Sequence, residues 1–232
     1  MKKMFTIAID GPAGSGKSST AKQVAKRLGY LFIDTGAMYR AVTLLAIRTG
    51  NLDKSETLLN LLANNTITLK PGEDGNIVFM NDEDITQTIR SEEINRNVSK
   101  ISSYPGIRAE LVRMQQEMGK QGGVVMEGRD ICSVVFPNAD FKFYFTASVE
   151  ERAKRRQKDL EAIGTFISLD EVMNSIISRD NYDSGREVSP LSKTADAIEI
   201  DTTSMTLEEQ CDFIVRLVRE KEQIEALSGF NL

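Results

Sequence analysis

The sequence of 232 residues lacks residues on which many catalytic sites depend. It contains no histidine, which excludes Ser-His-Asp and Cys-His nucleophiles and metal sites ligated by histidine. Its two cysteines, Cys132 and Cys211, lie far apart and form no CxxC pair, so we expect free thiols rather than a disulfide or a metal site. The chemistry of this chain must therefore come from other side chains and from the backbone.

Long apolar runs and an excess of positive charge are missing as well. No stretch of 18 apolar residues occurs, and the apolar run after the two N-terminal lysines ends at Asp10, too early for a signal peptide. The formal net charge is −5, which does not favour binding to a polyanion. We therefore expect a cytoplasmic protein that binds neither membranes nor nucleic acids.

Short β-rich apolar runs alternate with helical patterns, which is typical of βαβ units and a parallel sheet. Five runs are candidate core strands: FTIAID, YLFID, GVVME, FKFYF and AIEID. Three of them end in an acid, at Asp10, Asp34 and Glu127. Because parallel sheets place their ligands at the carboxyl ends of their strands, this edge is where we expect a site.

The pattern changes between about residues 65 and 86. Two alternating runs, TITLK and NIVFM, flank the five residues PGEDG, which predicts an antiparallel hairpin with a five-residue turn. A hairpin that interrupts an α/β alternation indicates a small inserted subdomain.

Helix boundaries are marked in the sequence too. A helix is expected from Lys17 to Leu28, ended by Gly29, and Pro105 is expected to open another helix. Capping-box spacing, a side-chain acceptor followed three residues later by glutamate, occurs at Asp53, Ser148, Ser168 and Thr206.

The stretch GPAGSGKSS, which follows the first candidate strand, is the most informative part of the sequence. It fits the pattern G-x-x-x-x-G-K-[ST], with a strand before it and a helix after it. Its glycines let the backbone wrap an anion, and successive N–H groups then point at phosphate oxygens. We expect Lys17 to reach the β- and γ-phosphates and the Ser18 hydroxyl to ligate Mg²⁺. The residues predicted to bind a nucleoside triphosphate are Gly11, Pro12, Ala13, Gly14, Ser15, Gly16, Lys17, Ser18 and Ser19.

This loop alone does not show whether a phosphoryl group passes to water or to a second substrate. A switch GTPase needs DxxG and NKxD elements, and neither spacing occurs in the sequence. A motor or transporter ATPase needs an hhhhDE strand, whereas GVVME is followed by GRD. Arginines gather instead in EGRD, ERAKRR and SRDNYDSGRE, and a guanidinium group binds phosphate in a bidentate way. These groups favour phosphoryl transfer, which depends on positioning and charge neutralisation.

Five segments carry a specific family resemblance: IAIDGPAGSGKSSTAK, DTGAMYRA, GRDICSVVFPNAD, SRDNYDSGRE with the SPL after it, and DAIEIDTTSM. The sequence resembles the bacterial cytidylate kinases over essentially its whole length. The resemblance implies the α/β fold of P-loop nucleoside monophosphate kinases: a five-stranded parallel sheet in 2-3-1-4-5 order, flanked by helices, with a small inserted antiparallel β subdomain. It implies a single kinase domain at 1–232, a monophosphate-binding part at 35–100, a lid at 152–164 and the remainder as core.

The resemblance also implies an activity, namely transfer of the γ-phosphoryl group of ATP to CMP or dCMP, with Mg²⁺, by a monomer. Two alternatives remain open at this point. One is a P-loop kinase of another small acceptor, and the other is a nucleotide-dependent binding switch. A switch would hydrolyse or hold ATP without needing CMP.

Residue roles follow from the same resemblance. It places Thr35, Arg40, Arg129 and Arg186 near the acceptor phosphate. It places Tyr39, Arg179 and Asp183 around the sugar, and Ser99, Arg108 and Asp130 at the base. The implied catalytic residues are Lys17, Arg129, Arg155, Arg156 and Arg186. Arg155 and Arg156 are expected to close with the lid over the transferring phosphoryl group and exclude water.

Asp130 is the residue expected to recognise the base. A carboxylate accepts a hydrogen bond from the 4-amino group of cytosine, whereas the carbonyl oxygen of uracil would repel it. The family pattern more often reads GRDIGTVVFP, and here Cys132 and Ser133 replace its glycine and threonine. We expect these small residues to cause a local backbone adjustment after Asp130.

Overall fold

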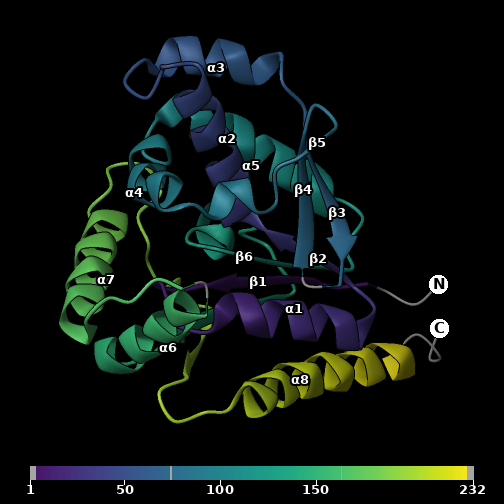
Figure 1. Ribbon diagram of the computed structural model, residues 1–232. Coiled ribbons are helices and arrows are strands. Elements are labelled where there is room, and N and C mark those ends of the chain that lie inside the picture. Colours follow the sequence, from purple (N-terminus) through teal and green to yellow (C-terminus); the bar gives the residue numbers. More distant parts are fainter. Residues whose placement is uncertain (1–3, 74, 163, 229–232) are drawn as a thin grey trace.

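A five-stranded parallel sheet is the central feature of the fold (Figure 1). The computed structural model describes residues 4–73, 75–162 and 164–228. The strands of the sheet are β1 (Thr6–Asp10), β2 (Leu31–Asp34), β6 (Val124–Gly128), β7 (Phe141–Thr146) and β8 (Ile198–Asp201). Their spatial order is β2-β6-β1-β7-β8, which confirms the predicted 2-3-1-4-5 order when these strands are counted along the chain.

The inner strands are apolar along most of their length because helices cover both faces of the sheet. On one face, α1 (Lys17–Leu28) and α8 (Leu207–Ser228) pack against a core that includes Phe143. On the other face lie α5 (Pro105–Gly119) and a π-helical turn, η2 (Ile131–Val135). Figure 1 shows α1 and α8 below the sheet and α5 above it. The predicted boundaries of α1 and the predicted start of α5 are confirmed.

The predicted insert is a small antiparallel sheet. β3 (Ile67–Gly72) pairs with β4 (Gly75–Met80), and a short strand that was not predicted, β5 (Glu83–Asp84), pairs with β4. The expected five-residue turn was wrong, because the strand ladder continues until Gly72 pairs with Gly75. Gly75 has a φ of +118°, which only glycine adopts readily, and this allows the tighter reversal. Residue 74 lies outside the described residues.

Helices connect the insert to the central sheet. They are α2 (Thr35–Arg48), α3 (Ser55–Ala63), the 3₁₀ turn η1 (Thr88–Arg90) and α4 (Glu92–Ile101). Together with the insert and α5, they enclose a second apolar core that includes Met38, Leu58 and Ile101. The part expected at 35–100 to bind the monophosphate therefore has its own core beside the sheet.

Two further helices, α6 (Val149–Glu161) and α7 (Leu169–Ser184), pack against each other through Ala153 and Ile176. The lid expected at 152–164 corresponds to most of α6 and the turn after it, where residue 163 lies outside the described residues.

Three of the four predicted helix caps are present. Ser148, Ser168 and Thr206 each accept a hydrogen bond from the backbone N–H three residues later. The prediction for Asp53 was wrong, because this carboxylate forms an ion pair with Lys100 instead. A cap of this kind contributes about 1 kcal/mol.

Both cysteines, Cys132 and Cys211, are buried and free, as predicted. Among the helices that the structure describes, none combines the length and the apolar character needed to cross a membrane.

Candidate active site

The loop between β1 and α1 has the backbone shape that phosphate binding requires. Gly14 and Gly16 have φ values of +76° and +89°, and a Cβ on Gly14 would lie 3.0 Å from the carbonyl oxygen of Arg152. α1 begins at Lys17, and no described side chain caps its first N–H groups. Because these groups point out of the helix N-terminus, they can bind an anion.

Lys17, Ser18 and Glu127 form a polar cluster where the loop meets the end of β6. Ser18 Oγ donates to Glu127 Oε1 at 2.7 Å, and Lys17 Nζ lies 3.8 Å from Glu127 Oε2. Lys17 Nζ also donates to the carbonyl oxygen of Pro12 at 3.1 Å. Burial lowers the pKa of Lys17 to about 7, with Arg129 acting in the same direction and Glu127 opposing it. A triphosphate in the loop would supply the negative charge that this buried cation needs.

The chemistry of this cluster fits Mg²⁺. The Ser18 hydroxyl and the Glu127 carboxylate are hard oxygen donors within hydrogen-bond distance of each other, and Mg²⁺ prefers such donors. In the described part of the chain, no three His, Cys, Asp or Glu residues gather as a metal site. These two oxygens suit an ion that keeps phosphate oxygens and water as its other ligands.

Three arginines surround one buried carboxylate, Asp183, on α7. Arg129 Nε donates to Asp183 Oδ2 at 2.9 Å, Arg186 pairs with Oδ1, and Arg179 Nε lies 3.9 Å from Oδ2. Burial acts to raise the pKa of Asp183, but the arginines outweigh it and hold that pKa below its usual value. Burial, with Arg129, lowers the pKa of Arg179 to about 10. Three cations around one anion leave an excess of positive charge.

Guanidinium groups in this region also retain unused donors. Within the described residues, the Nε atoms of Arg40, Arg179 and Arg186 are buried and have no hydrogen-bond partner. Because buried donors without partners are costly, such an arrangement favours a ligand with several anionic oxygens.

The junction of β2 and α2 brings two further predicted residues to this edge of the sheet. Asp34 Oδ1 accepts from the Ala37 N–H at 2.9 Å and caps α2, while Asp34 Oδ2 accepts from Arg40 Nη2 at 2.8 Å. Thr35 Oγ1 donates to the carbonyl oxygen of Glu127 at 2.8 Å, which ties the start of α2 to β6. Thr35 and Arg40 are thereby placed beside the end of β6, near the loop.

The residues predicted to contact the base form a buried wall next to these cations. Arg108 and Asp130 are ion-paired and 3% and 4% exposed. Arg108 also donates to the carbonyl oxygen of Ser102 at 3.0 Å, and its guanidinium lies 5.5 Å from the centre of the Tyr39 ring. Burial raises the pKa of Tyr39 to about 12, and its hydroxyl has no partner among the described residues. Ser99 is half-buried on α4, one turn before Ser102.

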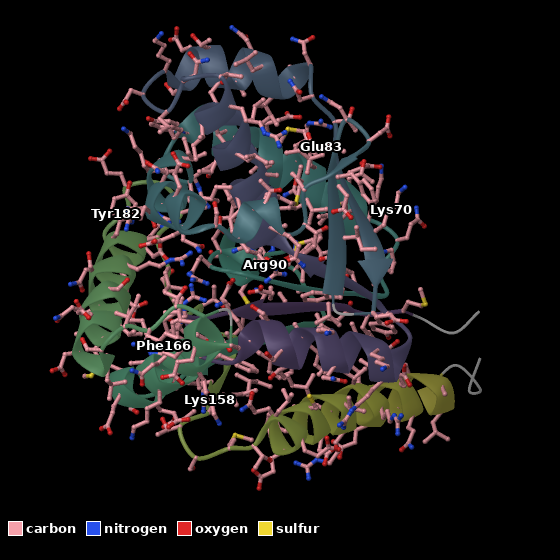
Figure 2. All side chains as sticks on the ribbon, in the orientation of Figure 1. Lys70, Glu83, Arg90, Lys158, Phe166 and Tyr182 are labelled. Carbon is pink, nitrogen blue, oxygen red and sulfur yellow. The ribbon has the colours of Figure 1, made fainter. Side chains whose placement is uncertain are left out.

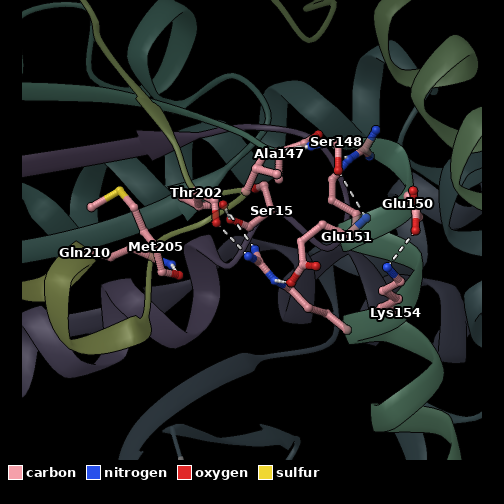
Figure 3. A network of polar contacts seen from close by, with 12 residues as sticks. Ser15, Ala147, Ser148, Glu150, Glu151, Lys154, Thr202, Met205 and Gln210 are labelled. Carbon is pink, nitrogen blue, oxygen red and sulfur yellow. Dashed lines mark hydrogen bonds and ion pairs between the residues drawn. The ribbon is translucent and has the colours of Figure 1, made fainter.

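Arg155 is a predicted residue whose hydrogen-bond partners lie outside the Asp183 cluster. Its guanidinium donates to Thr202 Oγ1 at 3.0 Å and to the Thr202 carbonyl oxygen at 2.6 Å, and its Nε donates to Glu151 at 3.0 Å. Figure 3 shows the network around Thr202, which itself donates to the Ser15 carbonyl oxygen. Arg155 is thus held against the end of β8. Arg156, in contrast, lies close enough to Arg179 to lower its pKa.

Sequence reasoning assigned no specific role to three residues that shape the site, Asp10, Glu127 and Arg152. Glu127 was noted only as a strand end, although an acid at the end of a strand beside the loop strand was a usable signal. Arg152, 5% exposed, donates to the Ala13 carbonyl oxygen at 3.0 Å and to Asp180 at 2.6 Å. Asp10 accepts from two N–H groups of η2 and fixes the turn after Asp130. Nothing in the local sequence pointed to the last two contacts.

The fold and the site together define a P-loop phosphotransferase. A phosphate-binding loop precedes the first helix of a 2-3-1-4-5 parallel sheet, and a second cluster of cations with spare donors lies at the same edge.

Comparison with known proteins identifies the family. A sequence model of the family described as cytidylate kinase matches residues 7–220. A cytidylate kinase of Geobacillus sp. (strain WCH70) is 51% identical over 222 residues, which cover 95% of this chain and 99% of that protein. The cytidylate kinase of Bacillus subtilis (strain 168) is 46% identical over 224 residues, covering 96% and 100% of the two chains. The chain belongs to the cytidylate kinase family and is a nucleoside monophosphate kinase.

One solved structure supports the fold independently. An uncharacterized protein from Eubacterium ventriosum ATCC 27560 aligns with a TM-score of 0.51 at 14% identity, covering 94% of this chain and 99% of that one.

Proposed function

We propose that this enzyme transfers the γ-phosphoryl group of ATP to CMP or dCMP, giving ADP and the nucleoside diphosphate. The observation that carries the proposal is the continuous group of cations that joins the loop to the Asp183 cluster. Arg129 and Arg179 both lie close enough to Lys17 to lower its pKa, so the two clusters share one electrostatic field. Two anionic substrates whose phosphates meet between them would neutralise that charge.

The reaction requires little covalent chemistry from the protein, because phosphoryl transfer depends on alignment and on stabilising charge. The loop N–H groups and Lys17 hold the β- and γ-phosphates of ATP. Arg40 and Arg186 orient the acceptor phosphate through their spare Nε donors, and Arg129 adds its positive charge. Mg²⁺, bound through Ser18 with Glu127 beside it, would neutralise charge on the β- and γ-phosphates.

Exclusion of water is assigned to the lid at 152–164. Arg155 would leave Thr202 and Glu151 on closure, and Arg156 would move with it toward the transferred group. Closure of this kind limits hydrolysis of ATP while the acceptor is absent.

Asp130 is assigned to recognition of the base. Arg108 occupies one carboxylate oxygen, Oδ2, and leaves Oδ1 to accept from the 4-amino group of cytosine. In Asp130→Asn, the new amide could donate to the O4 of uracil. We expect the ratio of kcat/KM for CMP to that for UMP to fall by about tenfold or more, since one such contact discriminates by about 1–3 kcal/mol. An unchanged ratio would remove Asp130 from base recognition and leave the kinase assignment intact.

The proposed function is tested by measuring ADP formation from Mg·ATP with CMP, dCMP, UMP, AMP, GMP or no acceptor. Turnover confined to CMP and dCMP is the expected result. Faster ADP formation with AMP or GMP, or no ADP formation with any of these nucleotides, would indicate a kinase of another small acceptor. Slow hydrolysis that is indifferent to every acceptor would indicate a nucleotide-dependent switch.

A further inference from the structure

The edge strand β2 obtains its outer hydrogen bonds from one side chain of the insert. β2 has a partner strand, β6, on one side only. On the other side, the Asp34 N–H donates to Asn76 Oδ1 at 2.9 Å, and Asn76 Nδ2 donates to the Phe32 carbonyl oxygen at 2.9 Å. Asn76 lies in β4 and is 8% exposed. Its carboxamide takes the place of the peptide group that a neighbouring strand would present.

The Asn76 side chain accounts for the hydrogen bonding described between the insert and β2. Within the residues that the structure describes, both hydrogen bonds between the β3–β4 hairpin and β2 come from Asn76. A hollow of about 290 Å³ lies next to it, lined by residues that include Asn76, Thr86 and Arg90. Figure 2 shows Arg90 on the insert side of the central sheet. Few atoms pack against the hairpin where it borders this hollow. The two hydrogen bonds of Asn76 therefore contribute more to fixing the position of the hairpin against β2.

Asp34, whose backbone N–H is bound by Asn76, also positions Arg40. The backbone N–H of Asp34 is fixed by Asn76, and the carboxylate of Asp34 caps α2 and binds Arg40. A shift of this backbone would move the N-terminus of α2 and the guanidinium together. An arginine must lie within a few tenths of an ångström of its target to keep a bidentate phosphate contact.

We propose that Asn76 is a positioning residue for the acceptor site: it locks the inserted hairpin onto β2 and thereby holds Asp34 and Arg40 in place for the acceptor phosphate. The inference rests on the proposed function, because it is there that Arg40 is assigned to this phosphate. The loop proposed to bind ATP follows β1, which β6 separates from β2, so we expect a smaller effect on ATP than on the acceptor.

The test compares wild type with Asn76→Leu, which has nearly the same shape and no hydrogen-bonding group. We expect KM for CMP to rise about tenfold while KM for ATP and kcat change less than about twofold. Hydrogen exchange at the Asp34 amide should become at least about tenfold faster. Exchange is measured without substrates, so it reports on the tie even if CMP is not the acceptor.

The matched control is Asn81→Gly in the same insert. The Asn81 side chain accepts from the Thr66 N–H and donates to Asn65, so its two hydrogen bonds stay within the insert and the residues that lead into β3. Glycine tolerates the positive φ of this position. We expect this variant to lower the melting temperature without changing either KM by more than about twofold.

A second variant, Asn76→Asp, keeps the acceptor for the Asp34 N–H but turns the donor to Phe32 into a charged oxygen. Its KM for CMP relative to wild type should fall as the pH is lowered, because the protonated carboxyl can donate again.

A CMP KM in Asn76→Leu that stays within twofold of wild type would overturn the proposal, as would an unchanged Asp34 exchange rate. Equal increases in both KM values would reduce Asn76 to a general structural role. If wild type does not use CMP at all while the exchange rates differ as expected, the proposed function fails and the tie between Asn76 and β2 stands.

Discussion

The two halves of the proposed active site offer different kinds of groups to negatively charged ligands. The loop half uses backbone N–H groups from one contiguous stretch together with Lys17. The proposed acceptor half offers guanidinium groups from α2, from the end of β6, and from α7 and the segment after it, each paired with a carboxylate such as Asp34 or Asp183. The first half is therefore encoded locally, whereas the second exists only once the fold has brought distant elements together.

Two buried carboxylates show the same contrast. Asp10, at the end of β1, accepts from the backbone N–H groups of Ile131 and Cys132 and contacts the Cys132 thiol, and burial, with the charge of Asp130 acting in the same direction, raises its pKa to about 6. Asp183 is equally buried but faces three arginines, and its pKa is lowered. A buried carboxylate that meets neutral donors thus stays costly to ionise, and one that meets cations does not.

The largest effect is expected from the one side-chain cation of the loop half. Lys17→Met keeps most of the side-chain volume and removes the charge. We expect kcat to fall by about 10³-fold if Lys17 stabilises the charge that develops between the phosphates, as proposed. The free energy of unfolding of the ligand-free enzyme should not fall, because burial already disfavours this charge. Steady-state kinetics and urea unfolding measure the two quantities.

Lys26→Ala, an exposed change on the same helix, serves as the control and should leave kcat unchanged. A decrease in kcat of less than tenfold in Lys17→Met would mean that the backbone N–H groups of the loop suffice to stabilise the phosphates. The contrast between the halves would then be sharper than proposed.

A second test removes the carboxylate that holds the acceptor half together. Asp183→Asn leaves Arg129, Arg179 and Arg186 without their shared counter-charge. We expect the free energy of unfolding to fall by about 3–5 kcal/mol, the usual cost of breaking a buried ion pair. Inorganic phosphate should restore stability more in this variant than in wild type, because an anion can occupy the same cluster. Urea unfolding with and without phosphate gives both results.

Asp53→Asn provides the comparison, because Asp53 pairs with Lys100 on the surface and is 81% exposed at its side chain. Its effect should stay within about 0.5 kcal/mol. If Asp183→Asn lowered the free energy of unfolding by as little as Asp53→Asn, the arginines would not need a counter-charge. The acceptor half would then resemble the loop half, where no stability is expected to be lost.

The same division explains what the sequence predicted. The strands, their order, the boundaries of α1 and the loop depend on neighbouring residues or on the family resemblance, and the structure confirms them. The hairpin turn was misjudged because the Gly72–Gly75 pairing depends on the glycine backbone rather than on the apolar pattern.

Two of the unpredicted contacts join residues that are distant in the sequence. Asp10 binds a turn more than a hundred residues away, and Asn76 binds Asp34 from across the insert. A single sequence contains no periodicity that links such pairs. The roles of individual residues toward ATP and CMP remain predictions, while their arrangement around the loop and Asp183 is now described.

The smallest effect expected is a pH dependence that separates the two carboxylates. The native state binds the Asp10 proton more tightly than the unfolded state, so between about pH 4 and pH 6 its contribution to stability is lost as the pH rises. The contribution of Asp183 has the opposite sign and is lost only as the pH falls below the usual value near 4. The difference in unfolding free energy between wild type and Asp10→Asn should therefore decrease with rising pH, by up to about 1.4 kcal/mol per pH unit, and level off above pH 6. Urea unfolding of both proteins at several pH values between 4.5 and 7 measures it. A difference that does not vary with pH would show that the N–H groups of η2 and the Cys132 thiol stabilise the ionised carboxylate fully, and neutral donors would then equal the arginines in this fold.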